Sequence, residues 1–229
     1  MTDWSIEAAG AQSVIIRFGT VIDPQLTPVI RAARDCIARE LQDQIVELIP
    51  AYTTLMVVYD VLQHDFDSIC AAIERPLQQA DSQPVKGRLL DIPVFYDVSV
   101  GFDLQRVADY HQTSVDTVIK RHSENIYQVF AIGFAPGFAY LGNVPGNLAT
   151  PRRDTPRLKV PAGSVAIADQ QTAVYPLETP GGWNIIGRSC LKMLDRDLPD
   201  LCPLGVGDRV RFTPVSRAEF LAQGGSLAS

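Results

Sequence analysis

Two stretches in the first 80 residues carry the three-to-four spacing of apolar side chains that is typical of amphipathic helices. The first covers residues 24–42 and the second covers 64–80. Asp65 is placed to cap the second helix, and Pro76 is expected to limit or kink its end.

Strand-like segments lie before and between these helices. Residues 4–22 alternate loosely and predict two short strands, whereas 45–60 predicts a strand, a break marked by Pro50 and a second strand. A further strand is expected at 88–96. This order of elements predicts a small two-layer α/β sandwich over residues 1–85.

After residue 100 the pattern changes from two short helices to many short strands. The helices are expected over 102–112 and 113–123, the second capped by Thr113. Short apolar segments follow at 125–134, 163–169, 172–177, 184–189, 190–194 and 208–214. Such strands, separated by Gly and Pro turns, predict a β-barrel or sandwich over 86–229, so we expect an α+β chain of two domains.

Glycine, proline and aromatic residues are concentrated between residues 133 and 187. Flexible linkers lack the aromatic residues, and proline-rich linkers lack the apolar strands. The segment therefore predicts a rigid set of shaped loops, which is where functional sites usually lie.

Bulk composition narrows the class of protein. The 229-residue chain has a formal net charge of −6 at pH 7, which argues against nucleic acid as a partner. No apolar run approaches a membrane span, and MTDWSIEAAG at the start lacks the pattern of a signal peptide. The four cysteines form no C-x-x-C pair. We therefore expect a cytoplasmic protein with reduced cysteines that binds neither nucleic acid nor a membrane.

The common catalytic motifs are missing from the sequence. It contains no phosphate loop, no dinucleotide fingerprint and no G-x-S-x-G nucleophile motif. His64, His111 and His122 are too scattered to predict a metal site by their spacing. Any activity must rest on a less stereotyped arrangement, and no metal ligands are predicted.

Four cations, Arg152, Arg153, Arg157 and Lys159, lie close together on a backbone stiffened by prolines. The planar guanidinium fork binds carboxylate or phosphate through two hydrogen bonds, so the pattern indicates an anion pocket. Two alternatives are a solvated basic loop and arginines paired with carboxylates of the same protein.

His122 falls on the apolar side of its predicted helix. Histidine is a suitable general acid or base near neutral pH. The alternative is a packed histidine at the helix end, with its ring hydrogen-bonded to the backbone.

The sequence TPGGW places Gly181 and Gly182 before Trp183. Consecutive glycines allow close backbone approach, so their amides are candidates to face an anion or a carbonyl. The alternative is a tight hairpin in which the tryptophan fills the interior of the barrel.

Other candidates lie in neighbouring segments. Phe138 and Tyr140 are interpreted either as the wall of a pocket or as an aromatic core. Gln171, Thr172 and Tyr175 are polar groups on a predicted pair of strands.

Two blocks of these residues, HSENIYQVFAIGFAPGFAYLG and PRRDTPRLKVPAGSVAIADQQTAVYPLETPGGWNIIGRS, closely resemble the allophanate hydrolase subunit 1 family. That family includes the B subunit of bacterial 5-oxoprolinase, an inhibitor of a sporulation sensor histidine kinase, and half of the carboxyltransferase domain of urea carboxylase. The strongest resemblance covers roughly residues 120 to 190.

The resemblance implies an N-terminal ferredoxin-like domain and a C-terminal cyclophilin-like β-barrel. It also implies a homologous second barrel subunit and a third subunit as partners. In the 5-oxoprolinase complex these subunits use ATP, expected with Mg²⁺ at the level of the complex, to open 5-oxoproline, a small carboxylate, to glutamate.

Residues carried over from the matching motifs are His122, Arg153, Arg157, Gln171, Thr172, Tyr175, Gly181, Gly182 and Trp183. The arginines and glycine amides are expected to hold a carboxylate or phosphate, and His122 to orient the substrate or move a proton. The chain departs from the family where Ala168 and Asp169 replace a usual glycine pair, which adds a negative charge beside the expected site.

The resemblance leaves three functions open. The first is a non-autonomous subunit of a 5-oxoprolinase, the second is an inhibitor that binds a sensor histidine kinase, and the third is a subunit of an allophanate or urea carboxyltransferase system. The third would need a biotin carried by another chain, because the only Lys-Met pair, Lys192-Met193, has no Met before it.

Overall fold

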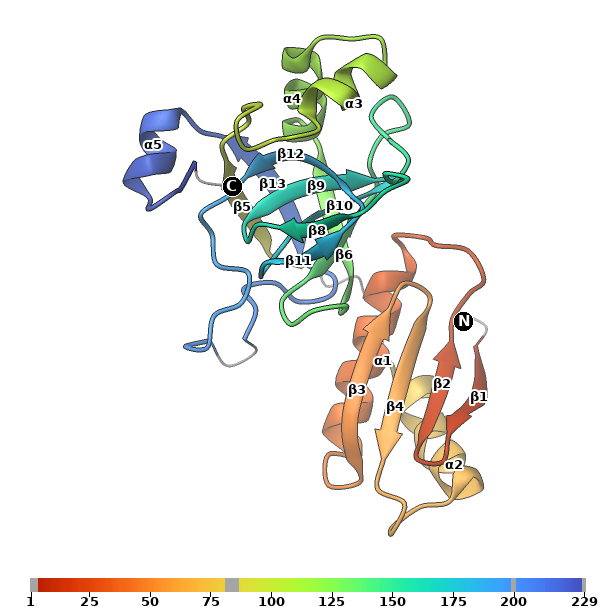
Figure 1. Cartoon of the computed structure of the whole chain (residues 1–229). Helices are drawn as coiled ribbons and strands as arrows, with labels where there is room; N and C mark the ends of the chain where they lie inside the picture. Colours follow the sequence, from red (N-terminus) through yellow and green to blue (C-terminus); the bar gives the residue numbers. More distant parts are fainter. Residues whose placement is uncertain (1–3, 81–86, 199–200, 228–229) are drawn as a thin grey trace. The chain divides into compact units, whose positions relative to one another are not determined.

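The structure is a computed structural model that describes residues 4–80, 87–198 and 201–227. It divides into two compact units, Met1–Gly87 (unit 1) and Arg88–Ser229 (unit 2), coloured from red to yellow and from yellow to blue in Figure 1. The boundary predicted between residues 85 and 86 lies outside the described residues. Both units combine helices with mostly antiparallel strands, so the chain belongs to the α+β class.

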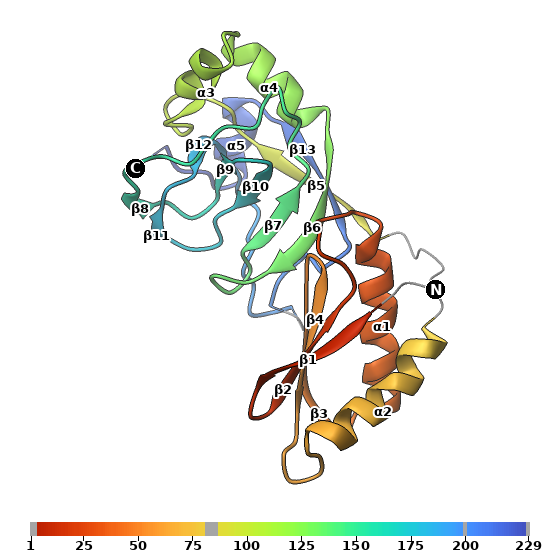
Figure 2. The same ribbon diagram turned by 90° about the vertical axis from the view of Figure 1, so that its right-hand side faces the viewer.

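Unit 1 is a four-stranded antiparallel sheet with two helices on one face (Figure 2). Its elements are β1 (Ser5–Gly10), β2 (Ser13–Arg17), α1 (Leu26–Glu40), β3 (Ile45–Ala51), β4 (Thr54–Tyr59) and α2 (Phe66–Gln79). The strand order is β1-β2-β4-β3. Apolar residues of both helices form one core with the inward residues of β2 and β4, as the periodicity predicted.

Local signals explain where these elements begin and end. Asp65 caps α2 as predicted: its carboxylate accepts from the backbone N–H of Ser68, and its own backbone N–H donates to the Ser68 hydroxyl, which forms a capping box. Pro76 lies in the last turn and lacks the N–H that would donate to the preceding turn, yet the helix continues to Gln79. The break predicted at Pro50 is wrong: Pro50 lies inside β3 opposite Leu55, and the chain reverses at Tyr52, whose φ is 40°.

Unit 2 holds the remaining elements. They are β5 (Leu89–Val94), α3 (Leu104–Tyr110), α4 (Val115–Ser123), β6 (Ile126–Ile132), β7 (Ala139–Gly142), β8 (Arg157–Val160), β9 (Ser164–Ala168), β10 (Gln171–Val174), β11 (Thr179–Gly181), β12 (Asn184–Arg188), β13 (Arg209–Pro214) and α5 (Arg217–Ala222). Helix α4 is capped by Ser114, not by the predicted Thr113. The strand predicted over 190–194 is absent: these residues form a loop.

The strands of unit 2 form a continuous path. Antiparallel pairing runs β6-β7-β10-β9-β12, while β13 pairs antiparallel with β6 and parallel with β5. A bridge between Phe95 and Arg188, with N–H···O distances of 2.9 and 3.0 Å, connects the end of β5 to β12. Strands β8 and β11 form a separate two-stranded ladder beside this path.

Candidate functional site

A cavity of about 530 Å³ opens in unit 2 between the β7, β9 and β10 strands and the loops around β8 and β11. Aromatic side chains form one part of its wall: Phe134, Phe138, Tyr140, Tyr175 and Trp183. Glycine and proline backbone closes another side, at Pro156, Pro180, Gly181 and Gly182. The remaining lining residues are Ala168 and three polar ones, Arg152, Asp169 and Gln171.

Phe138 holds the aromatic wall together. Its ring centroid lies 4.9 Å from that of Tyr140, 5.3 Å from that of Tyr175 and 5.6 Å from that of Trp183, all edge-to-face. This is the favoured geometry for aromatic pairs, in which the positive ring edge meets the negative face. Both sequence interpretations of these aromatics therefore hold at once, because the buried rings form a core cluster whose outer faces line the pocket.

The polar groups of the pocket come from two loops and the start of a strand. Asp169 follows β9 in the turn to β10, with φ of 51°, and its backbone N–H donates to Thr150 O at 2.8 Å. Aspartate is one of the few residues that adopt this left-handed conformation readily. Gln171 begins β10 immediately after the turn. The pocket thus presents a cation from one loop, a carboxylate from the β9–β10 turn and an amide from the start of β10.

Burial and the positive charge of Arg152 act in opposite directions on the pKa values of the two tyrosines of the pocket. Burial raises the pKa of the Tyr175 hydroxyl to about 12, and the positive charge of Arg152 opposes that shift. Burial likewise raises the pKa of Tyr140, again against the charge of Arg152. Both hydroxyls are therefore neutral hydrogen-bonding groups at pH 7, and Arg152 supplies the positive charge of the pocket.

Gly181 fits against Tyr175 with no room for a side chain. A Cβ at this position would overlap the Tyr175 hydroxyl oxygen and lie 2.9 Å from Cζ of the same ring. We expect Gly181→Ala to lower the free energy of unfolding by about 1–3 kcal/mol through overpacking, measured by urea denaturation. Adding Tyr175→Phe should recover part of the loss, because it removes the atom in closest contact.

The matched control for this prediction is Gly146→Ala, since a Cβ on Gly146 would meet nothing within 4 Å. Equal stability of the Gly181→Ala and Gly146→Ala variants would contradict the packing argument.

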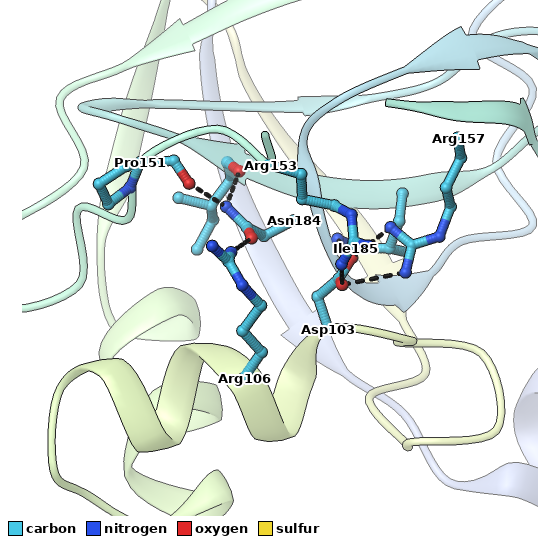
Figure 3. A network of polar contacts seen from close by, with 8 residues as sticks. Asp103, Arg106, Pro151, Arg153, Arg157, Asn184 and Ile185 are labelled. Carbon is cyan, nitrogen blue, oxygen red and sulfur yellow. Dashed lines mark hydrogen bonds and ion pairs between the residues drawn. The ribbon is translucent and has the colours of Figure 1, made fainter. Parts of the chain in front are cut away.

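Asp103 lies at the centre of a polar cluster beside the pocket (Figure 3). Its carboxylate accepts from Arg153 Nη1 at 2.5 Å, from Arg157 Nη1 and Nη2 at 2.7 and 2.9 Å, and from the backbone N–H of Ile185 at 2.8 Å. Asp103 is buried, and the Arg153 and Arg157 side chains are 29% and 22% exposed. Neither arginine lines the pocket. Of the three interpretations of the basic segment, pairing with a carboxylate of the same protein is the one that describes Arg153 and Arg157.

His122 lies in the interior of unit 2 and does not line the pocket. Its Nδ1 is 2.6 Å from the Tyr96 hydroxyl, its Nε2 is 3.0 Å from Thr172 Oγ1, and its ring stacks on Phe212. Burial lowers the pKa of His122 to about 3. The proton-moving role predicted for His122 is not supported by this geometry, because both ring nitrogens are occupied and the ring has no exposed surface.

The predicted residues thus separate into three groups. Those that line the pocket are Phe138, Tyr140, Gln171, Tyr175, Gly181, Gly182 and Trp183. Arg153 and Arg157 bind Asp103, whereas His122 and Thr172 bind each other in the interior. Within the basic segment the sequence did not distinguish Arg152 from its neighbours, and Asp103 was not predicted as a site residue.

Two kinds of feature are absent from the described ranges. No group of three or more His, Cys, Asp or Glu side chains there could hold a metal ion. No helix in those ranges has the length and apolar character needed to cross a membrane.

Comparison with known proteins identifies the family. Residues 4–204 match the family described as carboxyltransferase domain, subdomain C and D. The chain belongs to this family. The match covers β1 through the loop that precedes β13, and hence every residue of the pocket.

Relatives of this carboxyltransferase-domain chain include 5-oxoprolinase subunits. It is 36% identical over 230 residues to the B subunit of 5-oxoprolinase from Bacillus subtilis, covering 96% of each chain. It is 43% identical over 185 residues to the B subunit of 5-oxoprolinase from Escherichia coli O157:H7, covering 78% of this chain and 83% of that protein. The family resemblance inferred from the sequence is therefore confirmed.

Among solved structures, TTHA0988 matches with a TM-score of 0.80 and 33% identity. The match covers 90% of this chain but 40% of TTHA0988, so this chain corresponds to less than half of that longer protein.

Proposed function

We propose that this chain is the B subunit of an ATP-dependent 5-oxoprolinase, which opens 5-oxoproline to glutamate together with partner subunits. The names of the relatives support this assignment. The observation that carries it is the pocket, which combines flat aromatic walls with one cation, one carboxylate and one amide.

The chemistry of 5-oxoproline matches these groups one by one. Its flat lactam ring suits the aromatic wall, and its carboxylate suits the guanidinium of Arg152. Its lactam N–H is a donor for Asp169, and its lactam oxygen is an acceptor for the amide of Gln171. In this proposal the chain binds and orients the ring, and hydrolysis is completed by groups of the assembled complex.

ATP is the second substrate of the proposed reaction. Phosphoryl transfer to the lactam oxygen would activate the ring carbonyl for attack by water. The described residues contain no cluster of three or more His, Cys, Asp or Glu side chains suited to a metal ion, and the sequence has no phosphate loop. We therefore place ATP and Mg²⁺ on a partner or at a junction between subunits.

The finer description of the fold is part of the same proposal. In unit 1 the strand order β1-β2-β4-β3 with two helices on one face supports a ferredoxin-like domain. The chain order differs from the usual β-α-β-β-α-β, because the edge strand β1 comes first in the chain instead of last. In unit 2 the bridge between Phe95 and Arg188 connects the two ends of the strand path, which supports a closed cyclophilin-like barrel. We propose a cytoplasmic complex with a homologous barrel subunit and a third subunit.

The test is ATP hydrolysis that depends on 5-oxoproline, measured with this chain alone and then mixed with its partner subunits. We expect turnover only in the mixture. An assembled complex without turnover would reject 5-oxoproline as the substrate. Failure to assemble, together with binding to a sensor histidine kinase, would favour the inhibitor function.

Arg152→Ala is expected to raise KM for 5-oxoproline about tenfold or more, because a charge-assisted hydrogen bond contributes roughly 1.5–3 kcal/mol. Arg152→Lys should retain part of the affinity, since it keeps the charge but not the planar fork. Lys159→Ala is the matched control: Lys159 belongs to the same basic segment but pairs with Glu178 at 3.4 Å and does not line the pocket. An unchanged KM in Arg152→Ala would remove Arg152 from the site.

A further inference from the structure

Neighbouring residues of the segment 151–157 face in two directions. Arg152 and Pro156 line the pocket, whereas Arg153 and Arg157 turn to Asp103 on the other side. The two pocket residues are thus each followed directly by a residue that is bound to the same carboxylate.

Asp103 is itself fixed to the scaffold of unit 2. Its backbone N–H donates to Ile185 O at 2.8 Å, and its carboxylate accepts from the backbone N–H of Ile185 at 2.8 Å. Both bonds join Asp103 to β12, a strand whose five residues are all buried. The carboxylate therefore has a defined position from which it binds the two arginines.

Further hydrogen bonds connect the same segment to β12 (Figure 3). Asn184 Nδ2 donates to Pro151 O at 2.9 Å, and Arg106 of α3 donates to Asn184 Oδ1. The backbone N–H of Arg153 donates to Gly182 O at 2.8 Å, which joins the segment to the glycine wall of the pocket. The segment is thus attached at 151, 153 and 157, and Arg152 and Pro156 lie between these attachments.

We propose that Asp103 is a positioning residue for the pocket: by binding Arg153 and Arg157 it fixes the 151–157 segment and so places Arg152 toward the ligand. The consequence for 5-oxoproline rests on the proposed function. A misplacement of about 1 Å caused by a substitution outside the site can cost on the order of a hundredfold in catalysis, so the position of Arg152 matters as well as its charge. Asp103 touches no ligand in this arrangement and acts only through the segment.

The first test needs no ligand. Hydrogen exchange of the full-length chain, followed by mass spectrometry, reports the opening of the 151–157 segment. In Asp103→Asn we expect the Arg153 amide to exchange about tenfold faster or more through local opening. It should also keep exchanging faster than the amides of β13, whose rates rise only as far as unit 2 as a whole loses stability. Arg157→Lys, which keeps the charge but loses the two-pronged contact, provides a milder variant if Asp103→Asn folds poorly.

The second test separates positioning from a purely structural role. In the reconstituted complex we expect Asp103→Asn to raise KM for 5-oxoproline about tenfold with a smaller change in kcat, the same direction as Arg152→Ala. The double variant with Arg152→Ala should add little further, because both changes remove the same contact. Asp91→Asn is the matched control, since Asp91 forms an exposed ion pair with Arg211 in the same unit and should change neither readout.

The outcomes are distinguishable. An unchanged exchange rate at Arg153 would overturn the proposal, and so would faster exchange with an unchanged KM. If the unmodified complex shows no turnover of 5-oxoproline, the proposed function fails, and the exchange measurement alone decides whether Asp103 fixes the segment.

Discussion

Asp103→Asn is expected to lower the free energy of unfolding of unit 2 by about 3 kcal/mol, because the substitution leaves two largely buried guanidinium groups without a counter-charge. Asparagine keeps an oxygen that can still accept from the backbone N–H of Ile185, so the loss comes mainly from the arginines. Urea denaturation measures it, and a Trp4→Phe background leaves Trp183 as the only tryptophan, which reports on unit 2 alone.

The triple variant Asp103→Asn, Arg153→Met and Arg157→Met should recover most of this stability. Apolar side chains of similar volume leave no unpaired charge, and such replacements of buried ion pairs are often neutral or stabilising. Asp91→Asn, in the exposed pair with Arg211, should leave the free energy of unfolding nearly unchanged, because solvent screens that pair. A triple variant no more stable than Asp103→Asn would contradict the electrostatic explanation.

The sequence predicted those elements whose determinants are local. The helices α1, α2, α3 and α4 follow from apolar periodicity, and the cap of α2 follows from Asp65. The short strands β7, β8 and β11 were not predicted, because each has only three or four residues and too few positions to show alternation. Residues 190–194 form a loop, although a strand was predicted there. The apolar residues that suggested a strand, Leu191 and Met193, pack into the core without joining the strand ladder.

The candidate site was predicted less completely than the fold. All the residues that line the pocket lie in the Gly- and Pro-rich segment that the sequence indicated, between residues 133 and 187. Which of Arg152 and Arg153 faces the pocket depends on the backbone path of a loop, and periodicity does not encode that path. Asp103 precedes a helix and so has the sequence pattern of a cap, yet its side chain makes no capping hydrogen bond and binds residues 50 and 54 positions away.

His122 illustrates how burial changes the meaning of a titratable residue. Thr172 Oγ1 donates to Ala166 O at 2.9 Å, so it accepts from His122 Nε2–H, and Nδ1 in turn accepts from the Tyr96 hydroxyl. Burial raises the pKa values of Tyr96 and Tyr127, so both neighbouring tyrosines stay neutral throughout the acidic range. The ring is therefore a neutral imidazole with one defined tautomer that joins α4 to β10.

This neutral state predicts a loss of stability in acid. The folded protein holds the pKa of His122 at about 3, below the ordinary value of 6.5, so between pH 6.5 and 3 the unfolded chain binds a proton that the folded chain does not. Stability therefore falls as the pH is lowered through this window, by roughly 2–3 kcal/mol at pH 4.5 from His122 alone. Denaturation in urea at pH 7 and 4.5, followed by Trp183 fluorescence in the Trp4→Phe background, measures the change.

The decisive comparison is with His122→Gln, whose amide can replace both hydrogen bonds but does not titrate. Carboxylates with a lowered pKa, such as Asp208 beside Arg88, also lose stability in acid, but they are common to both proteins and cancel in the difference. We expect His122→Gln to lose about 2–3 kcal/mol less than the parent between pH 7 and 4.5.

His64→Gln, in unit 1, should leave the pH dependence of unit 2 unchanged. Equal acid sensitivity in His122→Gln and the parent would mean that His122 takes up a proton in the folded state, and the interior position would then have to open to water.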